Sequence, residues 1–349
     1  MSISRIARLN APGEVRAVAF DSEDRAVSTF IERWDGQGQP ASLGQTMTGR
    51  LRKVSPSDGG GFFELASGED VFVRGAIPDG LTLGAETCLL IVAEQRHEKL
   101  ARARVVESTD PSQPGFERWR TSLPGNTTDD VDESPEAADD VERVFDEVLS
   151  PTVGLPGGGA LHIDRTSALT AIDVDSAGRT GRGSAGARAY SINREAVAES
   201  ARHIALRRLG GLIVIDCVAP INRDAGEKLQ ADFLAGYKAC SNDAIDALRP
   251  SKYGLLEAKV AWGRTPLSDL MLDSTGAQTP ETELLAVLRA LQREAAADRT
   301  SFFSLALSKA AMGAYKLRKA ECDTILKNGF SGRVTISDEM SETSKVVRT

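Results

Sequence analysis

Two aspartates in this chain each end an apolar run that is typical of a buried strand. Asp173 ends LTAID and Asp216 ends LIVID. Because ligands of α/β sheets bind at the carboxyl ends of strands, we expect both carboxylates at one edge of a sheet. Two like charges brought together there repel each other, and a shared proton or a divalent cation relieves the repulsion. Mg2+ fits such a pair because it prefers one or two carboxylates together with waters and a phosphate oxygen.

Asp175 lies two residues beyond Asp173, so in an extended chain its side chain points the same way. It is a candidate third oxygen donor, or a group that positions a water. The alternative is that Asp173 and Asp175 are turn residues that cap backbone amides where the strand ends. The second strand ending at Asp216 strengthens the metal interpretation and leaves both open.

The loop SAGRTGRGSAGARAY follows Asp175 and contains Arg179, Arg182 and Arg188 but no acid. Glycine lets backbone amides approach an anion closely, and arginine binds phosphate in a bidentate manner. A carboxylate pair beside such a loop suits a phosphodiester substrate. The alternative is a solvated loop that binds nothing.

Other reactive residues are less informative. The turn PGGGA lacks the Lys-Ser/Thr of a P-loop, and no serine lies in a G-x-S-x-G motif. The three histidines form no H-x-x-x-H pair, and we expect His162 to be a half-buried strand residue rather than a general base. The four cysteines are far apart, which argues against a cysteine zinc site and suits a reducing compartment.

The segments around the aspartates alternate between strand and helix patterns, which predicts a layered α/β sheet. Before them, five short strands with Gly and Pro turns predict a small barrel, most simply an OB-fold, although a β-insertion without a ligand is the alternative. A stretch rich in Pro, Ser, Asp and Glu separates the two and predicts an exposed linker. The expected divisions are an N-terminal hairpin at 1–42, the barrel at 43–107, an acidic flexible linker at 108–140, a catalytic core at 141–275 and a small C-terminal α/β domain at 276–349.

The barrel segment carries aromatic side chains near basic ones, a combination that suits stacking on single-stranded bases. Strand alternation sends one of Phe62 and Phe63 into the core, so at most one of them is a platform, and core packing is the alternative for any single phenylalanine. The residues concerned are Phe62, Phe63, Phe72, Arg52, Lys53, Arg74 and Lys99.

Composition sets broad limits on the function. The chain has 349 residues and a formal net charge of −8, with 41% hydrophobic and 26% charged residues, which is ordinary for a globular protein. A surface that binds nucleic acid would therefore have to be local. With no long apolar stretch and no signal-like N-terminus, we expect no membrane association and a cytoplasmic location.

The stretches VGLPGGGALHIDRTSALTAIDVDSA, NREAVAESARHIALRRLGGLIVID and YGLLE together resemble the catalytic domain of the ribonuclease E/G family of bacterial endoribonucleases. The resemblance implies a ribonuclease H-like catalytic domain with an inserted OB-fold barrel and a small C-terminal α/β domain. It implies that Asp173 and Asp216 hold the catalytic Mg2+, with Mn2+ as a possible substitute. Phe62 and Phe72 fall where the family stacks RNA, and Lys99 falls at a basic RNA contact.

Several departures point to a reduced member of that family. Asp175 stands where the family usually has asparagine, and Cys217 follows Asp216 where a further acid is expected nearby. The family's zinc-link motif C-P-x-C is replaced by MLDSTGAQTP, so we expect no zinc and no zinc-linked dimer, while a homo-oligomer of another kind stays open. The segment that builds the family's 5′-monophosphate pocket is replaced by the linker.

The resemblance therefore predicts a Mg2+-dependent endoribonuclease that cuts single-stranded RNA in RNA processing or decay, including rRNA processing. Asp173 and Asp216 would hold the metal, and Asp175 would orient the attacking water. The arginine loop and the barrel would hold the strand. The alternative is an RNA-binding protein of the same fold with weak or lost nuclease activity, and a weaker third possibility is a DNA substrate.

Overall fold

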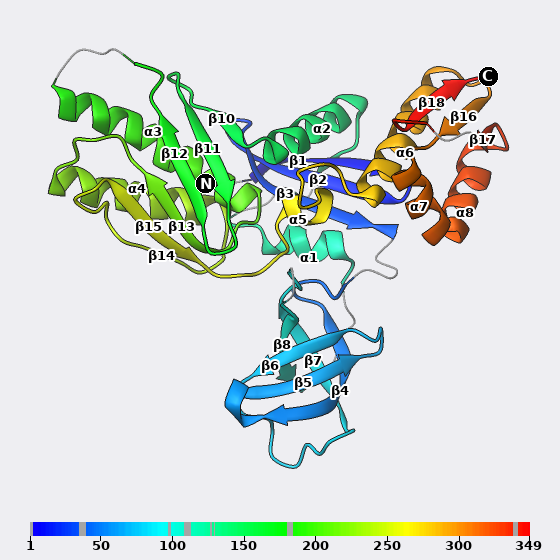
Figure 1. Cartoon of the computed structure of the whole chain (residues 1–349), viewed down its shortest axis with the longest axis horizontal. Helices are drawn as coiled ribbons and strands as arrows, with labels where there is room; N and C mark the ends of the chain where they lie inside the picture. The colour runs from blue at the N-terminus through cyan, green and yellow to red at the C-terminus, as the bar shows by residue number, and fades with distance from the viewer. Residues whose placement is uncertain are drawn as a thin grey trace.

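The computed structural model folds the chain into two larger mixed sheets, a closed five-stranded barrel and a small C-terminal sheet (Figure 1). The expected α/β class and the expected small barrel are therefore both confirmed. The structure describes residues 3–34, 40–96, 99–107, 113–125, 128, 130–179, 184–337 and 341–349.

The first sheet is built by the N-terminal strands. β1 (Ile3–Ala11), β2 (Glu14–Asp21) and β3 (Ala26–Arg33) pair antiparallel, and the short β9 (Val131–Asp132) pairs parallel to β1. Helix α2 (Pro135–Leu149) buries its apolar side against this sheet. The expected hairpin is thus two strands of a four-stranded sheet.

The barrel closes in the order β4-β5-β6-β8-β7 and projects from the rest of the molecule beside α1 (Figure 1). Its apolar interior includes Phe63, which is fully buried, so one of the Phe62–Phe63 pair lies in the core, as strand alternation predicts. The barrel strands are β4 (Thr46–Ser55), β5 (Gly60–Leu65), β6 (Asp70–Arg74), β7 (Glu86–Ala93) and β8 (Ala101–Val106), with the 3-10 turn η2 (Pro56–Asp58) between the first two.

The segment expected to be a linker contains a helix, α1 (Gly115–Ser122). Phe116 and Trp119 of this helix are buried, and their rings pack on Phe30 of β3. The polar composition of the segment hides these two aromatic anchors, because they are only two residues among many Pro, Ser and acidic ones. This part of 108–140 therefore packs on the first sheet, which differs from the flexible linker expected.

The second sheet carries the aspartates and has the strand order β10-β11-β12-β13-β15-β14. Helices α3 (Ala185–Leu206) and α4 (Arg223–Cys240) pack together over one of its faces and share a buried core with it (Figure 1). The strands are β10 (Thr152–Gly154), β11 (Ala160–Arg165), β12 (Thr170–Asp175), β13 (Gly211–Asp216), β14 (Ile245–Ala247) and β15 (Leu255–Val260).

The C-terminal part forms a three-stranded sheet with helices on it, in the order β17-β16-β18. Its core is separate from that of the aspartate sheet, although it includes Trp34 from the N-terminal region. The elements are α6 (Pro280–Ala297), β16 (Phe303–Ala306), α7 (Lys309–Leu317), α8 (Lys319–Phe330), β17 (Val334–Ile336) and β18 (Lys345–Arg348), whereas the preceding α5 (Leu267–Met271) packs in the core of the first sheet and α2.

The N-terminal strands and the aspartate strands belong to different sheets. Sequence patterns predict strands from local periodicity, whereas the choice of sheet depends on long-range pairing, so this division was not visible in the sequence.

Candidate functional site

Asp173 and Asp216 lie side by side at the carboxyl ends of two neighbouring parallel strands. Asp173 of β12 is the Cα partner of Asp216 of β13. Residues in register on neighbouring strands point to the same face, and the strands are about 4.8 Å apart. The two carboxylates expected at one sheet edge are therefore adjacent.

The two faces of this sheet differ in character because side chains alternate along each strand. Ile172, Val174 and Ile215 point to the face that α3 and α4 cover and are buried. Asp173 and Asp216 point to the opposite face and are exposed. The sequence therefore folds locally into an apolar inner face and an acidic open face.

The aspartate pair has no charge partner among the described residues. Neither carboxylate takes part in a hydrogen bond or ion pair there. Like charges directly opposite each other on neighbouring strands destabilise a sheet. Exposed carboxylate oxygens in this arrangement fit a hard divalent cation such as Mg2+, which takes one or two carboxylates and fills its other positions with water.

No larger acidic or histidine cluster completes a site made of protein ligands alone. In the parts of the chain that the structure describes, no group of three or more His, Cys, Asp or Glu side chains is arranged to hold an ion. Among the described residues this edge thus offers an ion no more than a pair of these carboxylates, and Asp173 and Asp216 are the two in register.

Asp175 has a local structural role. Its Oδ1 accepts a hydrogen bond from the backbone N–H of Ala177 at 2.7 Å, which closes the turn after β12. Asp175 is exposed on the same face as Asp173, two residues further along. Asp175 therefore caps the turn with one of its two carboxylate oxygens, as the turn-capping alternative predicts.

The arginine loop is held mainly by an ion pair within the protein. The guanidinium of Arg179 donates to both carboxylate oxygens of Glu195 in α3, at 3.1 and 2.9 Å. Glu195 also accepts from the backbone N–H of Gly157 at 3.0 Å, and this carboxylate raises the pKa of Arg179 mainly through the hydrogen bond. Arg188 lies half-buried in the first turns of α3, and Arg182 lies outside the described residues.

A second loop reaches the pair from the other side, and sequence reasoning did not single it out. Gly254 has φ +90°, and a Cβ placed on it would lie 3.9 Å from Oδ1 of Asp216. The two residues before it are exposed: Tyr253 is 74% exposed, and Lys252 lies over its ring at 4.8 Å. Lys252 and Tyr253 thus immediately precede the glycine that contacts Asp216, whereas Arg249, also exposed, acts electrostatically on Glu227 of α4.

Four neighbouring side chains form a row across four strands on the outer face of the barrel, with two aromatic rings in the middle and a cation at each end. Phe62 and Phe72 are Cα partners whose ring centroids are 5.1 Å apart. Lys53 is the partner of Phe62 on one side, and Arg102 is the partner of Phe72 on the other. Lys99 lies beyond the row, exposed in the turn between β7 and β8. Both rings are half-buried, so each presents part of its surface to solvent.

The barrel is tied to the aspartate-bearing part by a short connection next to β15. Glu94 accepts hydrogen bonds from the backbone N–H of Leu43 at 3.0 Å and of Thr265 at 2.7 Å. The guanidinium of Arg96 stacks on the ring of Trp262 at 3.5 Å. These contacts hold the barrel to the loop that follows the last long strand of the sheet.

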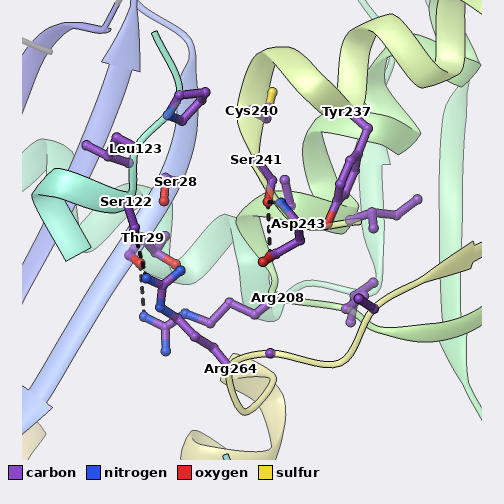
Figure 2. A pocket seen from close by; sticks show the side chains of 16 residues that line it. Ser28, Thr29, Ser122, Leu123, Arg208, Tyr237, Cys240, Ser241, Asp243 and Arg264 are labelled. Carbon is purple, nitrogen blue, oxygen red and sulfur yellow. Dashed lines mark hydrogen bonds between the residues drawn. The ribbon is translucent and has the colours of Figure 1, made fainter. Parts of the chain in front are cut away.

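A small polar cavity lies between β3, α1 and the C-terminal ends of α3 and α4 (Figure 2). Its volume of about 30 Å3 holds about two waters, too little for a nucleotide. Arg264 donates to Ser122 Oγ at 2.8 Å, whereas Nε of Arg208 has no protein partner, and burial lowers the pKa of Arg208 to about 10. The cavity therefore fits water that hydrates a buried arginine.

Two further observations limit the site. In the described parts of the chain no helix is long and apolar enough to cross a bilayer. The four cysteines are free, and burial raises the pKa of Cys217, next to Asp216, to about 12.

Comparison with known proteins identifies relatives of the aspartate-bearing part. Residues 129–259, which include both aspartates, match the Ribonuclease E/G family. Ribonuclease E of Buchnera aphidicola subsp. Schizaphis graminum is 33% identical over 171 residues, covering 46% of this chain and 17% of that protein. Ribonuclease E of Escherichia coli is 33% identical over 174 residues, covering 46% and 16%. Ribonuclease E of Synechocystis sp. is 41% identical over 117 residues, covering 34% and 16%. The matched part is thus a small fraction of each relative's length.

Proposed function

From the membership of residues 129–259 in the Ribonuclease E/G family, we propose that this chain is an endoribonuclease, a hydrolase that cuts phosphodiester bonds within RNA. The observation that carries the proposal is the adjacency of Asp173 and Asp216 on the open face, within the matched segment. Their carboxylates have no partner among the described residues and so are available for a ligand.

Mg2+ is the cation that fits this pair best, with Mn2+ as an alternative, because both prefer carboxylate oxygen and water ligands. When bound, such an ion supplies charge that stabilises the transition state of phosphodiester hydrolysis. Asp173 and Asp216 would hold it. The surrounding residues have the task of bringing the RNA backbone to the open face and of orienting water there.

Single-stranded RNA is the substrate that the rest of the surface suits. Phe62 and Phe72 offer two neighbouring rings for stacking bases, and Lys53 and Arg102 flank them for phosphate contact. Lys99 extends this basic edge.

We assign Lys252, two residues before Gly254, and Arg188 of α3 to phosphate contacts beside the aspartates. Arg179 contributes only if it leaves its bidentate pair with Glu195. A basic contact set of this kind makes binding sensitive to salt.

The finer architecture is part of the same proposal. We assign residues 152–260 as a ribonuclease H-like core, supported by a mixed sheet with one parallel pair and two helices on one face. Residues 276–349 are assigned as a small separate α/β domain, supported by their own buried core. The activity would take place in the cytoplasm, where free cysteines stay reduced.

A second candidate is an RNA-binding protein of the same fold that has lost catalysis. The observation that favours it is Asp175, where one carboxylate oxygen caps the following turn instead of facing the metal pair. The neighbouring Cys217, buried and protonated, adds no oxygen ligand where the family expects a further acid.

One experiment separates these two functions. The purified chain is incubated with single-stranded RNA and a matched DNA strand, with Mg2+ or with a chelator. We expect RNA to be cut only with the metal, and the variants D173N and D216N to lose cutting by 10^2-fold or more while keeping RNA affinity. Full RNA binding without any cutting by the unmutated chain would establish the second candidate, and cutting by D173N and D216N at the normal rate would refute the assigned site.

A further inference from the structure

Asp216 and Asp173 are in register on neighbouring strands, and the next side chain in this row across the sheet is a histidine. His162 of β11 is the Cα partner of Asp173, on the side away from Asp216. Directly opposite side chains on antiparallel strands share a face and have Cβ atoms about 4.5–5.5 Å apart. His162, expected only as a half-buried strand residue, is half-buried, but it lies on the open face next to the Asp173 carboxylate.

A neighbouring threonine sets the orientation of the imidazole. Thr152 of β10 is the next member of the row, and its Oγ1 lies 3.2 Å from Nδ1 of His162. With the hydrogen on Nδ1, the ring donates to Thr152, and Nε2 keeps its lone pair. Thr152 is itself fixed, since its N–H donates to Ser150 Oγ at 3.2 Å and its carbonyl accepts from the same hydroxyl at 2.9 Å.

This arrangement is the usual one for a histidine that supports a metal site, where one ring nitrogen is held by a hydrogen-bond partner and the other faces the ion. Direct ligation does not fit here. His162, Asp173 and Asp216 do not form a three-residue group that could hold an ion, as judged over the described residues. A single water between the imidazole and the carboxylates would connect these groups by hydrogen bonds.

We propose that His162 is a positioning residue of the aspartate site, whose Nε2 accepts a hydrogen bond from a water shared with Asp173. The place of this water follows from the register of His162 with Asp173 and from the contact of Nδ1 with Thr152, and its role as the attacking water rests on the proposed function. His162 takes over a task assigned to Asp175 in the sequence, because Asp175 lies about 6.6 Å further along its strand and uses Oδ1 for a turn.

The reaction that this water would perform is ordinary hydrolysis. The water oxygen forms a bond to phosphorus while the bond from phosphorus to the leaving ribose oxygen breaks. The leaving oxygen takes up one proton, and the water releases one to solvent. His162 only fixes the direction of the water, so its role is positioning and not acid or base catalysis.

The test uses three variants of the full chain: H162V, H162Q and T152V. H162V removes the acceptor and keeps a good strand former, whereas H162Q retains a polar oxygen. We expect H162V to lower kcat about tenfold or more with KM for RNA unchanged, and to weaken Mn2+ binding about tenfold, as the loss of a hydrogen-bond partner of a metal site typically does. H162Q should recover much of both, and T152V should show a smaller loss. D164N, on the same strand and face but in the next row, is the matched control and should change neither.

Mn2+ binding is followed by electron paramagnetic resonance without RNA, so the outcome does not depend on nuclease activity. If the chain binds Mn2+ through the aspartates but cuts no RNA, the proposed function fails while a weaker Mn2+ affinity in H162V still supports the place of His162. Equal Mn2+ affinity in H162V and the unmutated chain overturns the proposal, as does H162Q behaving like H162V. T152V decides the question in the same way if H162V fails to fold, as judged by circular dichroism.

Discussion

Asp173 and Asp216 face each other across a parallel strand pair, and neither has a hydrogen-bond or charge partner among the described residues. Like charges placed directly opposite each other destabilise a sheet by about 0.2–1 kcal/mol. In a chelator, D173N should therefore raise the free energy of unfolding by about 0.5 kcal/mol. With Mg2+ the unmutated chain should become more stable than D173N, because an ion that binds only the folded state stabilises the chain that keeps both carboxylates.

Urea unfolding with and without Mg2+ measures both effects. D164N removes a negative charge from the same open face but from a different row, so it should show neither the gain nor the reversal. If Mg2+ stabilises D173N as much as it stabilises the unmutated chain, the ion does not bind at this pair.

Gly254 and Gly276 form a matched pair for testing the loop beside Asp216. Both have a positive φ, of +90° and +83°, but a Cβ on Gly254 would lie 2.9 Å from the carbonyl oxygen of Cys217, whereas one on Gly276 meets nothing within 4 Å. Alanine in this backbone region costs about 1–2 kcal/mol. G276A should lose that amount alone, and G254A should lose about 1–3 kcal/mol more through overpacking.

Because the strain in G254A lies next to Asp216, its nuclease activity should also fall, while that of G276A should not. Urea unfolding and RNA cleavage measured on both variants check this. Equal losses of stability in the two variants would show that the loop around Gly254 shifts away from the Cys217 carbonyl at no extra cost in free energy.

The tilted pair Phe62 and Phe72 predicts how the barrel binds RNA. Stacking a base on an aromatic ring contributes about 1–3 kcal/mol, so F62A and F72A should each weaken binding of single-stranded RNA by about that amount. F302A is the control, since Phe302 is 58% exposed but lies in the C-terminal part. Fluorescence anisotropy with a labelled oligonucleotide measures the three affinities, and a loss in F302A as large as in F62A would rule out a specific platform.

The aspartate pair could be predicted from the sequence because each half of it is a local signal. An apolar run followed by a carboxylate marks the end of a strand, and the strand-end rule for α/β sheets then brings Asp173 and Asp216 to one edge. That one of Phe62 and Phe63 lies in the barrel core could be predicted for the same kind of reason, since alternation along a strand is a property of the local sequence.

Features that depend on long-range pairing could not be predicted. The position of His162 beside Asp173 follows from the register of two strands, and a slip of one residue would turn the histidine to the other face. The capture of Arg179 by Glu195 depends on how the loop folds back onto α3. Trp119 is buried because a helix forms within a segment whose composition indicates a linker.

A buried histidine predicts how stability changes with pH. The His203 ring is fully buried, with Nε2 3.2 Å from Glu147 Oε1 and Nδ1 accepting from Arg207 Nε at 3.3 Å. Burial lowers the pKa of His203, and the hydrogen bond with His203 is the main reason that the pKa of Glu147 falls to about 2. Both folded values lie below the unfolded ones, so both groups stabilise the fold above the unfolded pKa and lose this contribution as the pH falls.

The free energy of unfolding should therefore decrease below about pH 6.5, because His203 takes up a proton in the unfolded chain before it does in the folded one, and again from about pH 5 toward pH 2 for the same reason at Glu147. Urea unfolding between pH 7.5 and 3.5 measures this. In H203N the decrease between pH 7 and 5 should be reduced, because the titrating ring is gone. An unchanged slope in H203N over that interval would contradict the assignment.

Glu14 predicts how the N-terminal sheet and the C-terminal part depend on each other. This carboxylate is 2% exposed and bonds Arg16 of its own strand at 2.6 Å, Arg33 of β3 at 3.0 Å and Arg289 of α6 at 2.5 Å. Burial alone would raise the pKa of Glu14, but the three arginines hold it below its usual value. E14Q leaves Arg16 without its counter-charge, while Arg33 and Arg289 keep only Glu281 and Glu142, so it should destabilise the fold by about 3–5 kcal/mol. E23Q, at an exposed ion pair, should change the free energy of unfolding by no more than about 1 kcal/mol.

Since Glu14 joins β2 to α6, limited proteolysis of E14Q should release the C-terminal part at a lower urea concentration than in the unmutated chain. Equal urea midpoints for E14Q and E23Q would show that this buried cluster does not hold the two parts together.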